Sequence, residues 1–362
     1  MGASVPRPTE DRPVKAWGDL PGERSARERA DTEAAIEVAG IDLDPVPYGH
    51  RHEGGTAPDH AHPHHHSLPG ETPYTGIVGA GAVGTALGAA LSRAGWPIHA
   101  VASRDASRRE RFTSLVDGAR AFVEPQALVE EVELVILAIP DDVIAPLAAT
   151  IRMYGGQAMI HTSGALGAEV LQPAMAAGTQ IGAFHPLVAF AETERAIAAL
   201  HGATVAIEGD DQLAALLSQM AERIGATAVR LAPGSKAAYH AAAVLAAGGF
   251  IALLDAITEL GAVAGLDEPG SLAIYGPLIE GTLGNARALG VQAALTGPMT
   301  RGDVGTLDAH LAALATHAPA ALELYAAAAR REIALAQARG TLAPETAATM
   351  TRSVAAALAR AV

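Results

Sequence analysis

Residues 75–84 carry the sequence TGIVGAGAVG, and this stretch decides the fold. Its first four residues are apolar enough to form a short buried strand, and a helix of small residues follows the last glycine. The glycines have the spacing of a dinucleotide-binding turn. Gly79 permits the tight turn, Gly81 allows a pyrophosphate to approach the backbone, and Gly84 lets the helix pack closely on the strand.

The helix after this turn predicts an anion site. The backbone N–H groups of Ala82, Val83 and Gly84 would point toward a bound phosphate at the helix N-terminus. A glycine-rich turn without a ligand is the alternative.

The end of the second expected strand favours NADP over NAD. An NAD-binding protein usually places Asp or Glu about 20 residues after the glycines, where the carboxylate binds the ribose hydroxyls. This chain has Ser103 and Arg104 there, and a guanidinium suits a 2′-phosphate in both charge and shape. Asp105 argues for NAD unless it begins the next helix.

Short apolar runs alternate with helical segments from residue 75 onward, which predicts βαβ units and a doubly wound parallel sheet. The expected strands are Thr75–Gly79, Ile98–Ala102, Leu134–Ala138, Ala158–His161, Ile181–Phe184, Thr204–Ile207 and Thr227–Leu231. The expected helices are Val83–Ala94, Ser107–Val116, Ile144–Ile151 and Asp211–Ile224. Because ligands bind at the carboxyl ends of such strands, Ile139 and Pro140 are expected to line the nicotinamide side, unless they only form a turn.

Three regions follow from the changes in pattern. Residues 1–71 are predicted to be a disordered, His-rich tail, and residues 72–231 an NADP-binding Rossmann domain. Residues 232–362 are predicted to be an all-α domain that binds substrate and forms a dimer. Seven of the 14 histidines lie between His50 and His66, where a linker with incidental affinity for metals is favoured over a defined metal site.

Composition excludes several classes of protein. A net charge of −14 without a basic patch argues against nucleic acid, and the lack of cysteine excludes disulfides and thiolate metal sites. The N-terminus lacks the pattern of a secretory signal, so a cytoplasmic location is expected. The Ala-rich stretch 237–254 is expected to be a buried helix of a protein that does not cross a membrane.

Three segments carry the residues suited to chemistry, and the first two end expected strands. They are His161 to Gly164, which includes Ser163, then His185-Pro186, and then the helix start with Lys236 and His240. Lys236 and His240 are four residues apart and share one helix face. The three histidines could instead have only structural roles at strand ends or in helix packing.

Lys236 is the strongest catalytic candidate. The chain has 25 Lys and Arg residues but only two lysines, Lys15 and Lys236, so the sequence otherwise uses arginine for positive charge. A lysine can polarise a carbonyl and release a proton, whereas an arginine stays protonated. Farther along, Arg301 is expected to hold a substrate carboxylate, unless it pairs with Asp303 and only orders its loop.

Together these motifs resemble the Rossmann-like proteins that carry a DUF2520 domain, within the 6-phosphogluconate dehydrogenase-like superfamily. The resemblance covers about residues 73–350. It implies a Rossmann domain followed by a helical domain, and dimers formed through the helical domain. Lys236 matches the catalytic lysine of the hydroxyacid dehydrogenases in this superfamily, but His240 stands where those enzymes have Asn.

The leading hypothesis is an NADPH-dependent reductase of a small keto acid, similar to ketopantoate reductase. Lys236 would donate the proton and stabilise the oxyanion, while Ser163, His185 and His240 hold polar groups of the substrate, aided by His161 and Gly164. Imine reduction or a dehydrogenase of the prephenate or arogenate type is an alternative. A non-catalytic NADP-binding sensor or scaffold is another.

Overall fold

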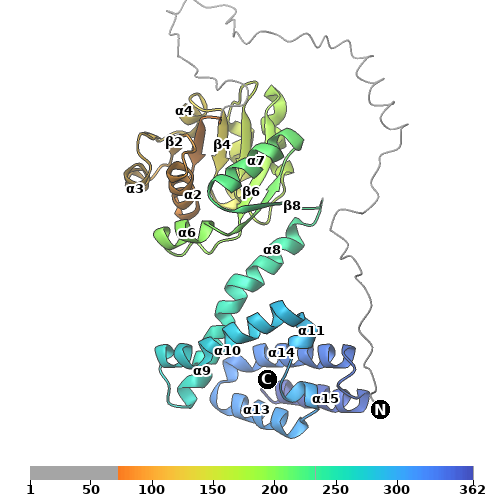
Figure 1. Ribbon diagram of the computed structural model, residues 1–362. Coiled ribbons are helices and arrows are strands. Elements are labelled where there is room, and N and C mark those ends of the chain that lie inside the picture. The colour runs from red at the N-terminus through yellow and green to blue at the C-terminus, as the bar shows by residue number, and fades with distance from the viewer. Residues whose placement is uncertain (1–71, 233, 362) are drawn as a thin grey trace, which may run out of the picture. The chain divides into compact units, whose positions relative to one another are not determined.

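The computed structural model describes residues 72–232 and 234–361, so the predicted tail and its histidine tract lie outside the described residues. The described chain begins with an eight-stranded sheet flanked by helices and continues as a series of helices (Figure 1). The predicted fold class, an α/β region followed by an all-helical region, is confirmed.

The sheet has the strand order β3-β2-β1-β4-β5-β6-β7-β8, and its first six strands follow the order of a Rossmann fold. The strands are β1 (Thr75–Val78), β2 (Ile98–Ala102), β3 (Arg120–Phe122), β4 (Leu134–Leu137), β5 (Ala158–His161), β6 (Gln180–Pro186), β7 (Thr204–Glu208) and β8 (Thr227–Arg230). Every neighbouring pair is parallel except β6 and β7, which are antiparallel. The sequence patterns indicated seven of these strands but missed β3 and the reversed direction of β7.

Helical segments cover both faces of the sheet because successive strand residues point to opposite sides. Ile77 joins one apolar core with α2, α6 and α7, and its neighbour Val78 joins a second core with α4, α5 and η1. The segments are α2 (Ala82–Arg93), α3 (Ala106–Leu115), α4 (Pro125–Val129), α5 (Asp141–Thr150), η1 (Ala168–Ala177), α6 (Thr193–Leu200) and α7 (Asp211–Arg223). Three of them, α4, α6 and η1, were not anticipated from sequence, and α5 begins at Asp141 rather than at the expected Ile144.

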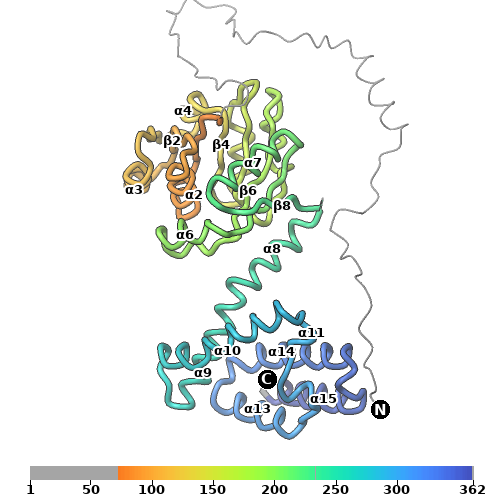
Figure 2. Tube along the Cα trace, viewed as in Figure 1, coloured from red at the N-terminus to blue at the C-terminus, as the bar shows by residue number. Residues whose placement is uncertain are grey.

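The strands end at Arg230, and after this point the described chain is helical (Figure 2). A third apolar core forms among α13, α14 and α15, with Met299 at its edge. The helices are α8 (Lys236–Val244), η2 (Leu245–Gly249), α9 (Phe250–Val263), α10 (Glu268–Leu289), α11 (Val291–Ala294), α12 (Pro298–Arg301), α13 (Val304–His317), α14 (Pro319–Ala338) and α15 (Pro344–Ala361).

The expectation that residues 237–254 form a buried helix is wrong. They belong to a continuous helical run, Lys236–Val263, whose most apolar window has no buried residue in the described chain. This run is long and apolar enough to cross a membrane by length and composition alone, which is weak evidence for a span. The Ala-rich sequence has no polar face that would have revealed the exposure of this helix.

Candidate functional site

The turn between β1 and α2 needs glycine at two positions for steric reasons. Gly79 has φ +107°, and a Cβ there would lie 2.2 Å from the carbonyl oxygen of Ala138. A Cβ on Gly84 would lie 1.9 Å from the carbonyl oxygen of Gly79. Gly81 is different, because a Cβ there would meet nothing within 4 Å. The protein itself therefore leaves space above Gly81, where the sequence predicted the approach of a pyrophosphate.

The N-terminus of α2 is free to receive an anion. Gly81 is the N-cap residue, and no side chain caps the helix. The first turn contains no acidic residue that would repel a phosphate. Ala82 is exposed and Val83 half-buried, so the backbone at this helix start borders solvent. These features fit the phosphates of a dinucleotide.

Ile139 and Pro140 lie at the same edge of the sheet as the glycine turn. Val78 and Leu137, the last residues of β1 and β4, are partners in the parallel register. The Cγ2 atom of Ile139 would lie 3.0 Å from a Cβ on Gly79, and Pro140 is the N-cap residue of α5. The structure thus brings both residues to the turn, as expected of residues that line a bound cofactor.

The residues that follow β2 include Asp105, whose carboxylate caps a helix, and Arg104, whose guanidinium has no partner among the described residues. Asp105 caps α3 by accepting a hydrogen bond from the Arg108 N–H at 3.1 Å, which agrees with its reading as a helix start. The Ser103 hydroxyl accepts from the Asp105 N–H, and the Ser103 carbonyl accepts from Arg109. Arg104 is exposed and has no hydrogen bond or ion pair to any described residue. It is therefore available for a 2′-phosphate.

A row of paired residues crosses four strands at the carboxyl edge of the parallel sheet. Leu137 pairs with His161, His161 with Ala183, and Ala183 with Glu208 on the antiparallel β7. This register brings the ends of β5 and β7 into line, with His185 two residues beyond Ala183 on β6. His161, His185 and Glu208, which are far apart in the sequence, therefore lie at the same edge of the sheet.

His161 organises the loop that follows β5. Its ring is fully buried, its Nε2 atom lies 3.1 Å from the Gly167 carbonyl, and its Nδ1 atom accepts from the Ser163 N–H at 3.2 Å. This pattern requires the proton on Nε2 and occupies both ring nitrogens. The Ser163 hydroxyl oxygen accepts from the N–H groups of Ala165 and Leu166. His161 therefore positions this loop and has no ring nitrogen left for a substrate.

Gly164 lies against two imidazole rings. A Cβ on Gly164 would be 2.3 Å from Nδ1 of His240 and 2.6 Å from Nε2 of His185. The ring centroid of His185 lies 5.7 Å from that of His240 and 5.8 Å from that of Tyr239. The end of β6, the loop after β5 and the first turns of α8 therefore meet here, and Tyr239 joins the group that the sequence predicted.

Lys236 completes this group from the first residue of α8. Its side chain is buried, and Nζ lies 3.0 Å from Oε1 of Glu208. The contact is an ion pair, and Nζ has no other polar partner among the described residues, so those of its three N–H groups that are not directed at Glu208 lack an acceptor there. Glu208 was not anticipated, since nothing in the local sequence at the end of β7 distinguishes it from a surface glutamate.

Unpartnered polar atoms are concentrated in this group, which we name the catalytic cluster and define as Ser163, His185, Glu208, Lys236, Tyr239 and His240. Of the six buried side-chain atoms without a hydrogen-bond partner in the described chain, four belong to it. They are Nδ1 of His185, Oη of Tyr239, Nδ1 of His240 and Nζ of Lys236, of which only Nζ has an ion-pair partner. Buried polar groups are usually satisfied, so a cluster of exceptions indicates a place where a ligand supplies the partners.

Burial controls protonation in the cluster. Desolvation, followed by the nearby Lys236 ammonium, lowers the pKa of His185 to about 4, so its imidazole is neutral at pH 7. Desolvation also lowers the pKa of His161, opposed by its hydrogen bond to Gly167. Burial raises the pKa of Tyr239, which keeps its hydroxyl protonated. Tyr239 therefore keeps a proton that it can donate at neutral pH, whereas the neutral His185 is a weak candidate for a proton donor.

Arg301 does not meet the catalytic cluster within the described chain. It is exposed at the end of α12, and no hydrogen bond, ion pair or ring contact in residues 72–232 and 234–361 joins it to the cluster. Asp303 instead caps α13, where it accepts from the N–H and hydroxyl of Thr306 at 3.0 and 2.7 Å. The predicted role of Arg301 as a carboxylate clamp thus has no support from these contacts.

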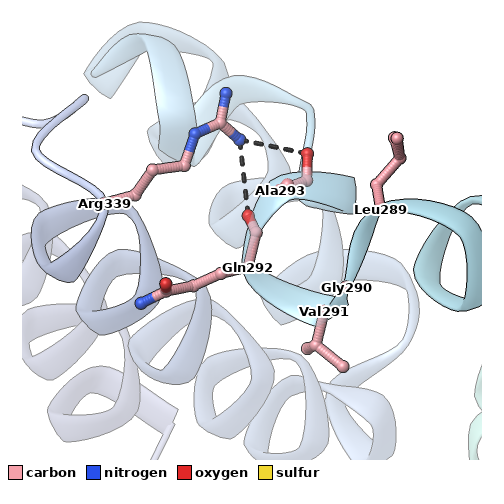
Figure 3. A pocket seen from close by; sticks show the side chains of 6 residues that line it. All are labelled: Leu289, Gly290, Val291, Gln292, Ala293 and Arg339. Carbon is pink, nitrogen blue, oxygen red and sulfur yellow. Dashed lines mark hydrogen bonds between the residues drawn. The ribbon is translucent and has the colours of Figure 1, made fainter. Parts of the chain in front are cut away.

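A hollow of about 420 Å³ on the helical region is lined by none of the cluster residues. Arg339 lies beside it and donates to the carbonyl oxygens of Gln292 and Ala293 at 3.4 Å (Figure 3) and of Leu295 at 3.0 Å. These bonds satisfy carbonyl groups at the end of α11, as basic side chains commonly do. Arg339 is the only ionisable side chain lining this hollow, so we assign it a structural role.

Two family models match separate parts of the chain. The Rossmann-like domain matches residues 65–186, and the domain of unknown function DUF2520 matches residues 203–332. The chain thus joins a Rossmann-like domain to a DUF2520 domain. This confirms the resemblance drawn from the sequence motifs. No curated protein matches the chain.

Solved structures with a similar fold cover most of the described chain. A protein from Bacteroides fragilis that is assigned as an NADP oxidoreductase is 24% identical, with a TM-score of 0.61, over 72% of this chain and 98% of that one. A reductive aminase from Aspergillus terreus in complex with NADPH and ethyl levulinate is 18% identical, with a TM-score of 0.51, over 80% and 95%. A 1-pyrroline-5-carboxylate reductase from Streptococcus pyogenes is 16% identical, with a TM-score of 0.52, over 74% and 98%. At these identities the similarity establishes the fold.

Proposed function

We propose that this chain is a cytoplasmic, NADPH-dependent reductase of a small carbonyl compound, with a keto acid as the first candidate substrate. The observation that carries the proposal is the group of four buried polar atoms without a hydrogen-bond partner in the catalytic cluster, only one of which, Nζ of Lys236, has an ion-pair partner, at the same sheet edge as the glycine turn. Proteins of similar fold are assigned to or complexed with NADP or NADPH, which supports the same cofactor here.

The residues present fit a bound dinucleotide. The open space above Gly81 and the uncapped N-terminus of α2 would hold the pyrophosphate, and Arg104 would bind the 2′-phosphate. Ile139 and Pro140 would line the nicotinamide side. The cofactor would supply the hydride that reduces the carbonyl carbon.

Lys236 is the proposed proton donor. Its ammonium is buried, and Glu208 is its only polar partner among the described residues, so N–H groups remain that can donate to a carbonyl oxygen. That oxygen becomes negative as the carbon accepts hydride, and the proton from Nζ then completes the alcohol. The unpartnered ring nitrogens of His185 and His240 would hold polar groups of the substrate, and the Ser163 hydroxyl can donate one further hydrogen bond.

Imine reduction is the second candidate. Glu208 places a carboxylate beside Lys236, and a carboxylate stabilises an iminium cation better than a neutral ketone. Two proteins of similar fold are a reductive aminase and a pyrroline carboxylate reductase. A substrate panel that contains both keto acids and cyclic imines separates the two candidates.

Comparison of Lys236 variants tests the proposed chemistry. With a substrate from that panel, single-turnover rates are measured for the wild type, Lys236→Ala and Lys236→Arg. Loss of one such donor lowers rates by about 10²–10³, and arginine should restore little because it does not release its proton. Reduction by Lys236→Ala within a few-fold of the wild-type rate would show that another group, with Tyr239 first, donates the proton.

We also propose that the active form is a homodimer whose interface covers the exposed apolar face of α8 to α10. Twelve of the sixteen exposed large hydrophobic side chains in the described chain lie between Val244 and Val291. An apolar surface of this extent marks an interaction site. A second copy supplies a matching apolar face by symmetry. A membrane is a poorer occupant, because Asp255 and Glu259 interrupt α9 and Glu280 and Arg287 interrupt α10.

A further inference from the structure

Glu208 occupies a place in the catalytic cluster that the proposed reaction does not yet use. It is the last residue of β7, the strand that runs antiparallel to β6, and its backbone pairs with Ala183 in the row that includes His161. Its side chain is 21% exposed, so it is largely removed from water. A carboxylate in such a place needs a specific partner, because burying an unpaired charge is costly.

The two carboxylate oxygens of Glu208 contact two different parts of the site. Oε1 lies 3.0 Å from Nζ of Lys236 on α8, and Oε2 accepts a hydrogen bond from the Ala168 N–H at 2.8 Å. Ala168 is the first residue of η1 and directly follows the loop that begins with Ser163 and Gly164. One side chain thus links the first residue of α8 to the loop after β5.

The other groups around Lys236 do not replace this charge. His161, His185 and His240 face the same space, and each can only be neutral or positive. Asp141, at the start of α5, acts electrostatically on His161 and His185, but it forms no ion pair with Lys236. Glu208 is therefore the only carboxylate paired with the ammonium within the described residues.

We propose that Glu208 is a positioning residue, which holds Lys236 as an ammonium and ties it to the loop of Ser163 and Gly164. This role rests on the proposed function of Lys236 as proton donor. Glu208 opposes the loss of a proton in a buried place where water cannot stabilise the charge. Because the ammonium carries three N–H groups and Glu208 is its only polar partner among the described residues, the remaining N–H groups stay available to the substrate.

The alternative is that Glu208 only joins α8 to the sheet. A residue that only joins α8 to the sheet needs a hydrogen-bond acceptor at this position, charged or neutral, whereas the proposed role needs the negative charge of a carboxylate. Glu208→Gln separates the two, because its amide oxygen can still accept from the Ala168 N–H. Glu208→Asp retains the charge with a shorter reach. Asp211→Asn is the matched control, because it also replaces a carboxylate by an amide, but in an exposed ion pair. In that pair Oδ1 of Asp211 lies 2.7 Å from Nη1 of Arg230.

The chain offers a direct measurement, because it contains only two lysines. Labelling lysine with ¹³C at Cε gives two NMR signals, with Lys15 as an internal reference, and Lys236→Arg assigns them. In Glu208→Gln the titration midpoint of the Lys236 signal should fall by about one pH unit or more, as for the loss of a close opposite charge. Glu208→Asp should titrate at higher pH than Glu208→Gln, and Asp211→Asn should match the wild type.

An unchanged Lys236 midpoint in a folded Glu208→Gln protein would overturn the proposal, whatever the enzyme's activity. The catalytic consequence is read separately, from the pH dependence of the single-turnover rate. In Glu208→Gln, the pH at which the rate declines on the alkaline side should be lower by the same interval as the NMR titration midpoint. The affinity for the cofactor should not change. If the NMR midpoint moves and the alkaline decline of the rate does not, Glu208 still holds the ammonium, and the assignment of Lys236 as proton donor fails.

Discussion

Replacing Gly81 and Gly84 separately with alanine should divide the glycine turn into a part that the fold needs and a part that the cofactor needs. A Cβ on Gly84 would lie 1.9 Å from the carbonyl oxygen of Gly79, so the backbone would have to move. Overpacking of this kind typically costs about 1–3 kcal/mol of unfolding free energy. Gly84→Ala should therefore destabilise the protein even without cofactor.

Gly81→Ala should leave the stability of the apoprotein nearly unchanged and should weaken cofactor binding. A Cβ there meets nothing within 4 Å, and Gly81 has φ −78° and ψ −169°, which alanine adopts without strain. Replacing glycine at an N-cap costs less than about 1 kcal/mol. The new methyl group would occupy the space reserved for the pyrophosphate, so NADPH affinity should fall at least about tenfold, or about 1.4 kcal/mol.

Denaturant unfolding of both apoproteins and calorimetric titration with NADPH measure the two effects independently. Gly81→Ala should show near wild-type stability with weak NADPH binding, and Gly84→Ala should show a clear loss of stability. Wild-type NADPH affinity in Gly81→Ala would refute the placement of the pyrophosphate over this glycine. A Gly84→Ala apoprotein as stable as the wild type would refute the steric argument.

Three further predictions address the cofactor, the cluster and the apolar face. NADPH should bind at least about tenfold more tightly than NADH, and Arg104→Ala should remove most of that preference; equal wild-type affinities in calorimetry would contradict it. Because the pKa of His185 is lowered to about 4, its contribution to stability is full above the ordinary value of about 6.5 and is lost as pH falls toward 4. Urea unfolding should therefore show that the free energy of unfolding falls by about 1–2 kcal/mol between pH 6.5 and pH 4, after allowance for solvent screening. His185→Gln should weaken this pH dependence of stability. An identical pH dependence in the two proteins would show that His185 does not cause it. Light scattering should give twice the chain mass for the wild type and a smaller mass for Leu278→Glu, a substitution at a side chain that is 66% exposed; a monomeric wild type that binds lipid vesicles would point to a membrane instead.

Local sequence was sufficient for the glycine turn and for seven strands, because each rests on spacing and apolar runs within a short window. It was insufficient for β3, α4 and α6, which have only three to eight residues and little periodicity. The direction of β7 could not be predicted either. Strand direction depends on how the chain returns to the sheet, and no local pattern encodes that.

The catalytic cluster was predicted in part for the same reason. Ser163, His185, Lys236 and His240 stand at strand ends or a helix start, where polar residues interrupt apolar sequence. Glu208 joins them only because the antiparallel register places it beside Ala183. Arg301 was chosen for its Gly/Pro-rich loop, yet the described contacts do not connect that loop with the cluster. Residue type indicated the chemistry, and long-range pairing decided which residues meet.

The most direct test of the central claim is the oxidation of NADPH by the wild type and by Lys236→Ala, followed by absorbance with a panel of small keto acids and cyclic imines. At least one compound should oxidise NADPH with the wild type, and Lys236→Ala should reduce the same compound about 10²–10³ times more slowly while binding NADPH with unchanged affinity. Equal rates for the two proteins, or no binding of NADPH to the wild type, would contradict it.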